Sequence, residues 1–498
     1  MLSYLELHKR SLSFILVTCL FYVSFGYDLI REDTSKLIGL AAACFFFTYK
    51  IIQWEGENFR LLFAAGLIFR ILLFGATPFL SQDFYRYIWD GQLLISGINP
   101  YLYTPNELID SLKDQMPNAP LLFEKMGDLS QKHYSNYPPI SQFIQALAAY
   151  IGQGSITAAA VVFKVIIIAA DVAVFFFSRR LMQLLKLPKQ NAFWYFLNPL
   201  VILELSGNLH LEGVMIAFFL AGVYWLIKAD DLLKENADIN DIGSTKKHIA
   251  IERTTTLNKI TSKKNTRTYL FVALLIAVSI MTKLIPILLY PFLIIPLGFK
   301  KWLQLGLYIL LFCGLLLLPL LGEGFFEYYL QTIGLWFNNF EFNASVYNIV
   351  KSISKSLGNS GYKTILSYGK WLPFLIISWA IIVLIWQKSL FKNTAVTIRV
   401  QYSIAFYAML FMLSGYLFLA TTVHPWYLIF GLILSLFTPY RYFIYWTAAV
   451  FISYATYAQP DFKENLWIIA IEYLGVFTLM IYEIVKIKTS QVISVKNV

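Results

Sequence analysis

Long apolar runs alternate with short polar segments along almost the whole chain. Because a helix needs about 20 residues to cross the hydrocarbon core of a membrane, we take runs near that length, and shorter runs bounded by charge or proline, as spanning helices. The pattern predicts an all-α polytopic membrane protein with about 12 to 14 transmembrane helices. The predicted segments lie at residues 11–25, 37–54, 59–77, 155–178, 191–205, 211–228, 268–282, 286–298, 302–321, 370–387, 401–420, 426–438, 441–457 and 464–485.

The composition agrees with this pattern and excludes a soluble protein. The 498 residues are 58% hydrophobic and only 14% charged, and their mean hydropathy is +0.62. A soluble domain of this length carries more charge and fewer apolar residues. We therefore interpret residues 1–498 as a single integral membrane domain. Lys9 and Arg10 precede an apolar run that no small-residue cleavage site follows, so we expect the first helix to be retained.

Basic residues predict the orientation of the helices. The net charge of +11 is typical of a membrane protein with basic cytoplasmic loops, and we expect no nucleic-acid partner. The richest basic stretch is residues 228–267, which we place in the cytoplasm under the positive-inside rule. If the predicted spans cross the membrane alternately from there, both termini and the other basic residues between spans also lie in the cytoplasm. These residues are Arg179, Arg180, Lys186, Lys189, Lys300, Lys301, Lys388, Lys392, Lys486, Lys488 and Lys496, and the basic stretch itself includes Lys246 and Lys247.

This topology predicts three long loops. Residues 78–154 form an outer loop with interfacial helices, one of them at residues 138–152, and residues 322–369 form a second outer loop. The short turns at residues 208–212, at Lys283 and at His424 fall on the same outer side. Residues 229–267 form a polar cytoplasmic loop, which we interpret as a mobile spacer. The three cysteines all lie in apolar segments, so we expect no disulfide framework. We find no internal repeat, no phosphate-binding glycine pattern and no His or Cys spacing typical of a metal site.

The stretch "SQDFYRYIWDG" at residues 81–91 concentrates charge directly after an apolar run. If it is helical, Asp83, Arg86 and Asp90 share one face with Tyr87 beside them. Two interpretations are open. An interfacial helix would hold its rings at the headgroup level and pair its charges with one another. Alternatively, a carboxylate at the membrane surface could take a proton from a hydroxyl, with the arginine keeping one carboxylate ionised.

The ends of this helix also carry signals. Ser81 is suited to be the N-cap, because its hydroxyl can accept a hydrogen bond from a free backbone N–H of the first turn. Gly97 is suited to end the helix, because glycine adopts the left-handed conformation that commonly follows a helix. We therefore expect a helix over residues 81–96.

Four motifs together resemble a known family. "SQDFYRYIWDGQLLISGINPYLYTP", "NYPPISQ", "GNLHLEGVM" and "TVHPWYL" are similar to bacterial polyprenol-phosphate-mannose-dependent mannosyltransferases of the GT-C glycosyltransferase superfamily. The resemblance spans about Asp83 to His424. It implies an integral membrane enzyme, in the bacterial inner membrane, that takes a sugar from a lipid-phosphate carrier on the outer face. The sugar, mannose by default in this family, passes to an acceptor hydroxyl with inversion.

The resemblance and the chemistry of the transfer suggest roles for individual residues. Asp83 matches the family's acidic residue of the first outer loop and is our candidate base. The candidates for catalysis are Asp83, Asp90 and Glu212, and those for the donor phosphate or the substrates are Arg86, Asn208, His210, Lys283, His424 and Tyr137. The family often has an Asn-Asp pair where this chain has Leu211 and Glu212, so the resemblance does not fix the role of Glu212. Lys283 could instead be a snorkelling lysine at a helix end, and both histidines could be structural.

The expected partners are a polyprenyl-phosphate-linked sugar, a glycan, lipid or protein acceptor, and membrane lipids. We expect no cofactor. Asp83 and Asp90 could hold a divalent cation, but two carboxylates without further ligands make a weak metal site, so we do not favour one.

Two other classes of function stay open at this stage. A lipid-linked sugar transporter or flippase would need charges inside the spans, and Arg70, Lys164 and Asp171 lie there. Pairing among these three residues is the simpler explanation. A non-catalytic membrane scaffold would need only the aromatic loops, and it predicts no loss of activity when Asp83 is changed.

Overall fold

The chain folds into a bundle of helices, and its structure is known as a computed structural model that describes residues 2–242, 250–338, 340–391, 397–458 and 462–496. No strand forms within these ranges, and the sole extended pairing there is a single bridge between Phe342 and Thr422. The predicted all-α polytopic fold is therefore confirmed.

Eight helices in the described ranges are long and apolar enough to cross a membrane. They are α1 (Leu2–Tyr27), α2 (Thr34–Glu55), α8 (Ile156–Leu184), α11 (Glu212–Ile242), α14 (Phe299–Leu317), α17 (Gly361–Phe391), α18 (Ile398–Leu419) and α21 (Leu466–Lys496). Three shorter apolar helices cover Thr266–Thr282 in α12 (Ala250–Thr282), Ile285–Leu297 in η3 (Ile285–Leu293) and α13 (Ile294–Leu297), and Pro425–Ser435 in η5 (Pro425–Tyr427) and α19 (Leu428–Ser435).

The other three predicted spans are not single long helices, so full-length spans in the described ranges are fewer than the 12 to 14 expected. Residues 59–77 form only α3 (Phe59–Leu72), and residues 441–457 divide into α20 (Tyr442–Ala449) and η6 (Val450–Ala458). Residues 191–205 break at Asn198-Pro199, where the Asn198 side chain accepts a hydrogen bond from Leu200 N at 2.9 Å. The residue before a proline disfavours the helical conformation, and hydropathy does not register that break. The pieces are η1 (Lys189–Ala192), α9 (Phe193–Phe196), α10 (Pro199–Val201) and η2 (Ile202–Gly207).

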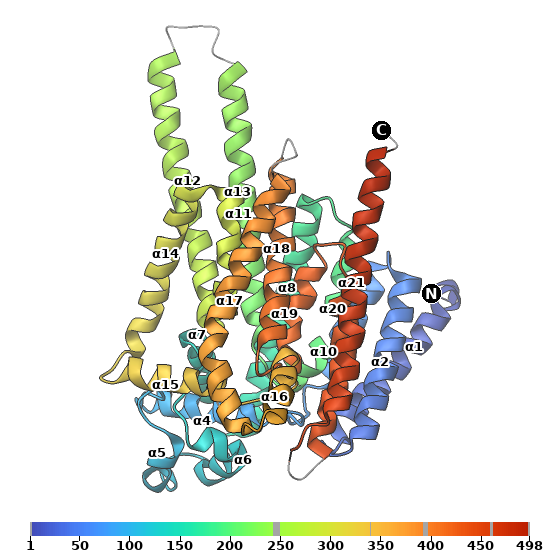
Figure 1. The fold of residues 1–498 in the computed structure, drawn as a ribbon, viewed down its shortest axis with the longest axis vertical. Helices are drawn as coiled ribbons and strands as arrows, with labels where there is room; N and C mark the ends of the chain where they lie inside the picture. The colour runs from blue at the N-terminus through green and yellow to red at the C-terminus, as the bar shows by residue number, and fades with distance from the viewer. Residues whose placement is uncertain (1, 243–249, 339, 392–396, 459–461, 497–498) are drawn as a thin grey trace.

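Polar segments gather at the two ends of the bundle as the topology predicted. Figure 1 shows α4 (Asp83–Ile95), α5 (Pro105–Leu112), α6 (Ala119–Gln131), α15 (Phe325–Asn338) and α16 (Val346–Ser356) at the lower end. The extensions of α11 and α12 and the C-terminus lie at the upper end. Residues 78–154 and 322–369 therefore share one end, which we call the loop end, and the basic stretch lies at the other, which we call the basic end. Lys246, Lys247 and Lys392 lie outside the described residues.

The predicted spacer loop at residues 229–267 differs from our expectation. Helix α11 continues to Ile242 and α12 begins at Ala250, so the described parts of this stretch are helical. The sequence is polar, but it contains no proline, the residue that breaks a helix most strongly. Polarity alone therefore did not indicate a loop.

Helix α4 packs closely on α7 (Pro139–Gly152), the short helix that we predicted at residues 138–152. A Cβ atom on Gly91 would lie only 2.3 Å from the carbonyl oxygen of Gln145, so this crossing requires glycine. The Ser141 hydroxyl donates a 2.6 Å hydrogen bond to the carbonyl oxygen of Thr282, the last residue of α12. The first outer loop is thus fixed to the end of a membrane helix.

Charges inside the bundle are held by local partners. Arg70 Nε lies 2.8 Å from Asp171 Oδ2, and the Tyr195 hydroxyl donates to Asp171 Oδ1 at 2.8 Å. Lys164 donates to the carbonyl oxygens at the end of α3, those of Leu73, Phe74 and Ala76. The expected pairing of Arg70 with Asp171 is confirmed, and Lys164 caps a helix end instead of joining that pair.

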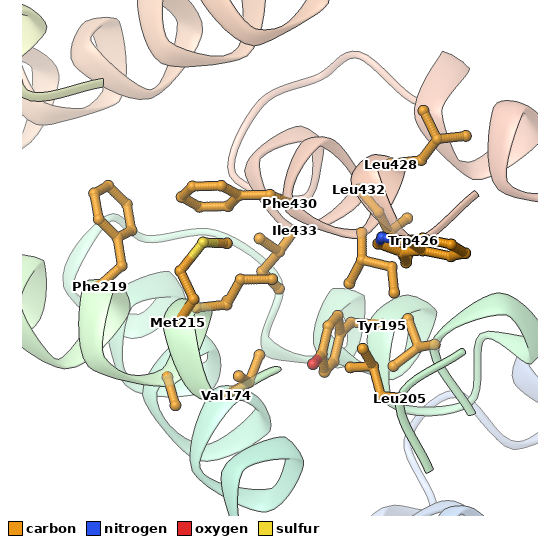
Figure 2. Close-up of a cluster of buried hydrophobic side chains, with 14 of the residues drawn as sticks. Val174, Tyr195, Leu205, Met215, Phe219, Trp426, Leu428, Phe430, Leu432 and Ile433 are labelled. Carbon is orange, nitrogen blue, oxygen red and sulfur yellow. The ribbon is translucent and has the colours of Figure 1, made fainter. Parts of the chain in front are cut away.

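An apolar core joins the N-terminal and C-terminal halves. Figure 2 shows Met215 and Phe219 of α11 facing Phe430 and Ile433 of α19, and the Phe219 and Phe430 ring centroids lie 5.2 Å apart. Trp426 stands at the edge of this cluster (Figure 2). The core therefore brings the "TVHPWYL" motif against the start of α11.

Candidate active site

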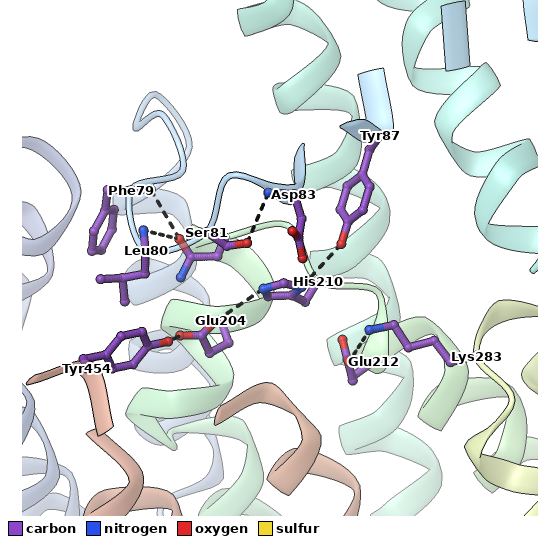
Figure 3. Close-up of polar contacts among 11 residues, drawn as sticks. Phe79, Leu80, Ser81, Asp83, Tyr87, Glu204, His210, Glu212, Lys283 and Tyr454 are labelled. Carbon is purple, nitrogen blue, oxygen red and sulfur yellow. Dashed lines mark hydrogen bonds and ion pairs between the residues drawn. The ribbon is translucent and has the colours of Figure 1, made fainter. Parts of the chain in front are cut away.

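Asp83 stands at the first residue of α4, at the loop end of the bundle. The preceding loop is fixed by Asn208, whose Oδ1 accepts hydrogen bonds from Leu80 N at 3.0 Å and Phe79 N at 3.3 Å. Ser81 Oγ accepts from Asp83 N at 3.2 Å, although the N-cap position itself is Gln82. The Asp83 side chain is half-buried and points into the space beside His210 (Figure 3).

The other end of α4 follows the predicted signal. The helix ends at Ile95, and Gly97 has a φ of 78°, the left-handed conformation expected of a glycine that follows a helix. Ile98 N donates back to Leu93 O at 2.9 Å and satisfies one of the last carbonyls.

Arg86 and Asp90 bind one another, and Arg86 lines a small pocket together with the candidate Tyr137. Arg86 Nε lies 2.6 Å from Asp90 Oδ1, and both side chains are buried. Arg86 also donates to the carbonyl oxygens of Ser130, in the last turn of α6, and of His133, just after that helix. The pair therefore fixes the first outer loop, which is the charge-pairing interpretation that the sequence left open.

His210 is placed by an unusual turn. The π-helical turn η2 is followed by Leu209 with a φ of 66°, and His210 N donates to Glu204 O at 3.2 Å. The fully buried ring has its Nδ1 3.5 Å from the Tyr87 hydroxyl and its Nε2 3.5 Å from Glu204 Oε2 (Figure 3). π-Helical turns are rare and are frequently found at functional sites, which agrees with the position of this turn beside the other candidates.

Trp426 lies between two histidine rings. Its centroid is 3.7 Å from that of His210 and 4.4 Å from that of His424, with interplanar angles of 20° and 7°. On the far side of His424 lies Phe342, at 5.1 Å. Phe342 is anchored to the segment before His424, because Val423 N donates to Phe342 O at 2.8 Å. The second outer loop therefore closes this ring stack.

Glu212 and Lys283 form an ion pair at the same end of two antiparallel helices (Figure 3). Glu212 is the first residue of α11, and Lys283 follows the last residue of α12. A negative charge at a helix N-terminus and a positive charge at a helix C-terminus are both favourable. Glu212 is 1% exposed and Lys283 is 18% exposed, so the ammonium group is the more accessible partner.

Electrostatics divides the site into ionisable and neutral groups. Burial raises the pKa of the Asp83 carboxyl, while the positive charges of Lys283 and Arg31 act in the opposite direction. Burial, with the nearby Lys283 charge, lowers the pKa of His424 to about 3 and holds that of His210 well below its ordinary value. Both imidazoles are therefore neutral at physiological pH.

Arg31 is a member of this site that sequence reasoning missed. It lies between α1 and α2, and its guanidinium carbon is 3.4 Å from the centroid of the Tyr457 ring. Its buried Nε has no hydrogen-bond partner within the described ranges. Its charge acts on both Asp83 and His424, so it faces the same space as Lys283.

The sequence analysis also missed Glu204, whereas it named Tyr137 as a candidate. Glu204 is fully buried in η2 and accepts a hydrogen bond from the Tyr454 hydroxyl. The Tyr137 ring packs edge-on against Tyr87, with centroids 4.9 Å apart. Of the predicted residues, the structure therefore brings together Asp83, Tyr137, Asn208, His210, Glu212, Lys283 and His424.

The site offers little that would hold a metal ion. In the described part of the chain, no group of three or more His, Cys, Asp or Glu side chains is arranged to bind one. Asp90, which could have shared a cation with Asp83, is occupied by Arg86. Independence from metal stays a prediction.

The amino-acid sequence matches the sequence model of a known protein family. The sequence model of the family described as "Alpha-(1->6)-mannopyranosyltransferase, N-terminal domain" matches residues 37–298. That range contains every predicted site residue except His424. Three further residues of the site, Arg31, Trp426 and Tyr457, also lie outside it.

Two curated relatives are similar over part of the chain. Alpha-(1->6)-mannopyranosyltransferase B of Corynebacterium glutamicum is 24% identical over 163 residues, which are 32% of this chain and 25% of the relative. Alpha-(1->6)-mannopyranosyltransferase A of Mycobacterium tuberculosis is 24% identical over 193 residues, 35% of this chain and 36% of the relative. The matches thus cover about a quarter and a third of those proteins. No solved structure matches the chain significantly.

Proposed function

Because the chain belongs to the alpha-(1->6)-mannopyranosyltransferase family, whose model matches more than half of its length, we propose that it is a GT-C glycosyltransferase that transfers mannose. The donor is a polyprenyl phosphate that carries the sugar, and the acceptor is a glycan hydroxyl. The reaction takes place at the loop end of the bundle, which faces the outside of a bacterial inner membrane. The observation that carries this proposal is the convergence of Asp83, the Glu212–Lys283 pair and the two histidines at that end.

Asp83 acts as the general base. Its carboxylate takes the proton of the acceptor hydroxyl while the acceptor oxygen forms a bond to the anomeric carbon. The bond between that carbon and the phosphate oxygen breaks, and the polyprenyl phosphate leaves with the electron pair. Burial supports this role because a raised pKa makes the carboxylate a stronger base, and the Lys283 and Arg31 charges keep it ionised.

Lys283 and Arg31 bind the donor phosphate. Charge accumulates on the phosphate oxygens as the glycosidic bond breaks, so cationic donors placed there stabilise the transition state more than the ground state. Arg31 suits this role because it is a cation without a carboxylate partner in the described ranges, and a guanidinium can bind two phosphate oxygens at once. His424 and His210 are neutral, so they contribute N–H donors and ring surface instead of charge.

The relatives' names specify an α-(1→6) linkage. If the same linkage forms here, direct displacement with inversion requires a donor whose sugar is β-linked to the phosphate. Analysis of the product linkage therefore tests both the reaction and its stereochemistry.

A transporter is the less favoured alternative. Its argument depended on charges inside the spans, and Arg70, Lys164 and Asp171 all have structural partners. A scaffold would not require an aspartate, a lysine and two neutral histidines to converge at one end.

The test is turnover by the purified full-length protein in detergent, with matched mannosyl donors. We expect mannose transfer and release of polyprenyl phosphate from the lipid donor, and none from a nucleotide sugar. Efficient use of the nucleotide sugar would overturn the donor assignment. Transport of the lipid-linked sugar across vesicle membranes without mannose transfer would overturn the assignment as an enzyme.

A further inference from the structure

A groove at the basic end of the bundle lies far from the candidate active site. It has a volume of about 370 Å³ and runs between α3 and the last turns of α8. Its apolar wall is made by Phe59, Phe63, Val172, Phe175 and Phe176, and its polar rim by Arg179, Arg180, Gln183 and Lys189. Helix α8 begins next to α7 at the loop end, so the groove lies near the opposite surface of the membrane.

The two arginines of this rim are held on aromatic faces. The Arg179 guanidinium carbon lies 4.7 Å from the centroid of Phe59 and 5.6 Å from that of Phe175. The Arg180 guanidinium carbon lies 4.5 Å from the centroid of Phe176. Cation–π contacts orient an arginine without neutralising it. None of the ion pairs found in the described ranges includes Arg179, Arg180 or Lys189.

Placement at the membrane boundary determines what such a groove can bind. Basic residues near the end of a membrane helix can simply extend their charges into water. Here, however, Arg179 is only partly exposed and lies over the phenylalanine wall. An uncompensated cation beside an apolar surface complements a ligand that has one anionic group and a hydrocarbon chain.

We propose that this groove binds an anionic phospholipid of the bilayer. Its headgroup phosphate contacts Arg179, Arg180 and Lys189, and part of an acyl chain covers the phenylalanine wall. Basic pockets between membrane helices are established sites for anionic headgroups. A polyprenyl phosphate donor is a different ligand, because its phosphate belongs near Asp83 at the loop end.

The test is native mass spectrometry of the full-length protein from vesicles of phosphatidylcholine with phosphatidylglycerol. We expect phosphatidylglycerol to be retained in preference to phosphatidylcholine. The double variant Arg179→Gln/Lys189→Gln should retain it on the order of tenfold more weakly, since each basic residue near the surface contributes appreciably to the binding of anionic lipid. The double variant Lys300→Gln/Lys388→Gln removes the same charge from exposed positions at the same end and should retain the lipid as the wild type does.

A variant that fills the groove gives a second, independent readout. Val172→Trp adds bulk to the apolar wall without changing the charge and should also reduce retention. Equal retention of the two lipids by the wild type, or equal losses in the two double variants, would overturn the proposal. Preferential retention of a polyprenyl phosphate would overturn it too, by making the groove a site for the carrier lipid.

Discussion

The His210 ring lies face to face with the Trp426 indole, with centroids 3.7 Å apart, although the two residues are in separate halves of the chain. The opposite face of the indole contacts His424. The positions of both neutral histidines in the site therefore depend on one aromatic side chain.

Replacement of Trp426 should consequently affect activity more than stability alone would explain. We expect Trp426→Leu to lower kcat/KM roughly 10- to 100-fold, because small misplacements of positioned groups are costly in catalysis. Phe430→Leu, in the adjacent core, is the matched control and should lower the thermal midpoint with little effect on the rate per folded molecule. Equal loss of rate in the two variants would assign Trp426 to packing only.

Variants of the Glu212–Lys283 pair can separate the contribution of Lys283 to stability from its contribution to catalysis. Lys283→Met leaves a buried carboxylate without a counter-ion, and we expect a stability loss of about 3 kcal/mol together with loss of turnover. Lys283→Met/Glu212→Gln removes both charges, so it should recover most of the stability in thermal unfolding but not the turnover. Recovery of turnover in the double variant would show that Lys283 serves only to neutralise Glu212.

Arg86 and Asp90 should behave as a structural pair. Arg86→Gln leaves Asp90 buried and unpaired, so it should destabilise the protein by about 3 kcal/mol. Turnover per folded molecule should stay within about tenfold of the wild type, because neither side chain contributes the base. A large loss of rate at an unchanged thermal midpoint would instead show that the pair takes part in catalysis.

The pH profile should identify the base and its neighbours. The active form of Asp83 is deprotonated and its pKa is raised, so kcat/KM should fall on acidification at a higher pH than an ordinary aspartate predicts. Arg31→Met removes a charge that favours the carboxylate, and it should move this acid limb to still higher pH. Lys300→Met, at the basic end, should leave the limb in place. A limb that Arg31→Met does not move would argue against Asp83 as the titrating group.

The sequence predicted the site best where polar motifs interrupt apolar runs on one side of the membrane. Asp83, His210, Lys283 and His424 each stand at a helix end, and the topology alone assigned them to one face. The same reasoning could not separate Asp83 from Arg86 and Asp90. All three share a helix, and the partners of Arg86 come from a loop whose position depends on tertiary packing.

Two residues of the site had weaker signals. Arg31 stands among acidic and polar neighbours in a short turn, where a charge is ordinarily solvated, and its contact with Tyr457 depends on the fold. Glu204 did carry a signal, because a lone glutamate within a predicted span is costly unless it has a partner. The span containing it is broken by Asn198-Pro199 and a π-helical turn, and hydropathy registered neither feature.

The most direct test of the account is kcat/KM for mannose transfer from a polyprenyl-phosphate donor by Asp83→Asn, measured beside Asp90→Asn. Both changes replace a carboxylate of α4 with its amide, but only Asp83 faces the ring stack and Lys283. We predict that Asp83→Asn lowers the rate by roughly 10² to 10⁴ with an unchanged thermal midpoint, as the loss of a general base requires. Asp90→Asn should lower the thermal midpoint and keep most of the rate. Wild-type turnover by a folded Asp83→Asn protein would contradict the central claim.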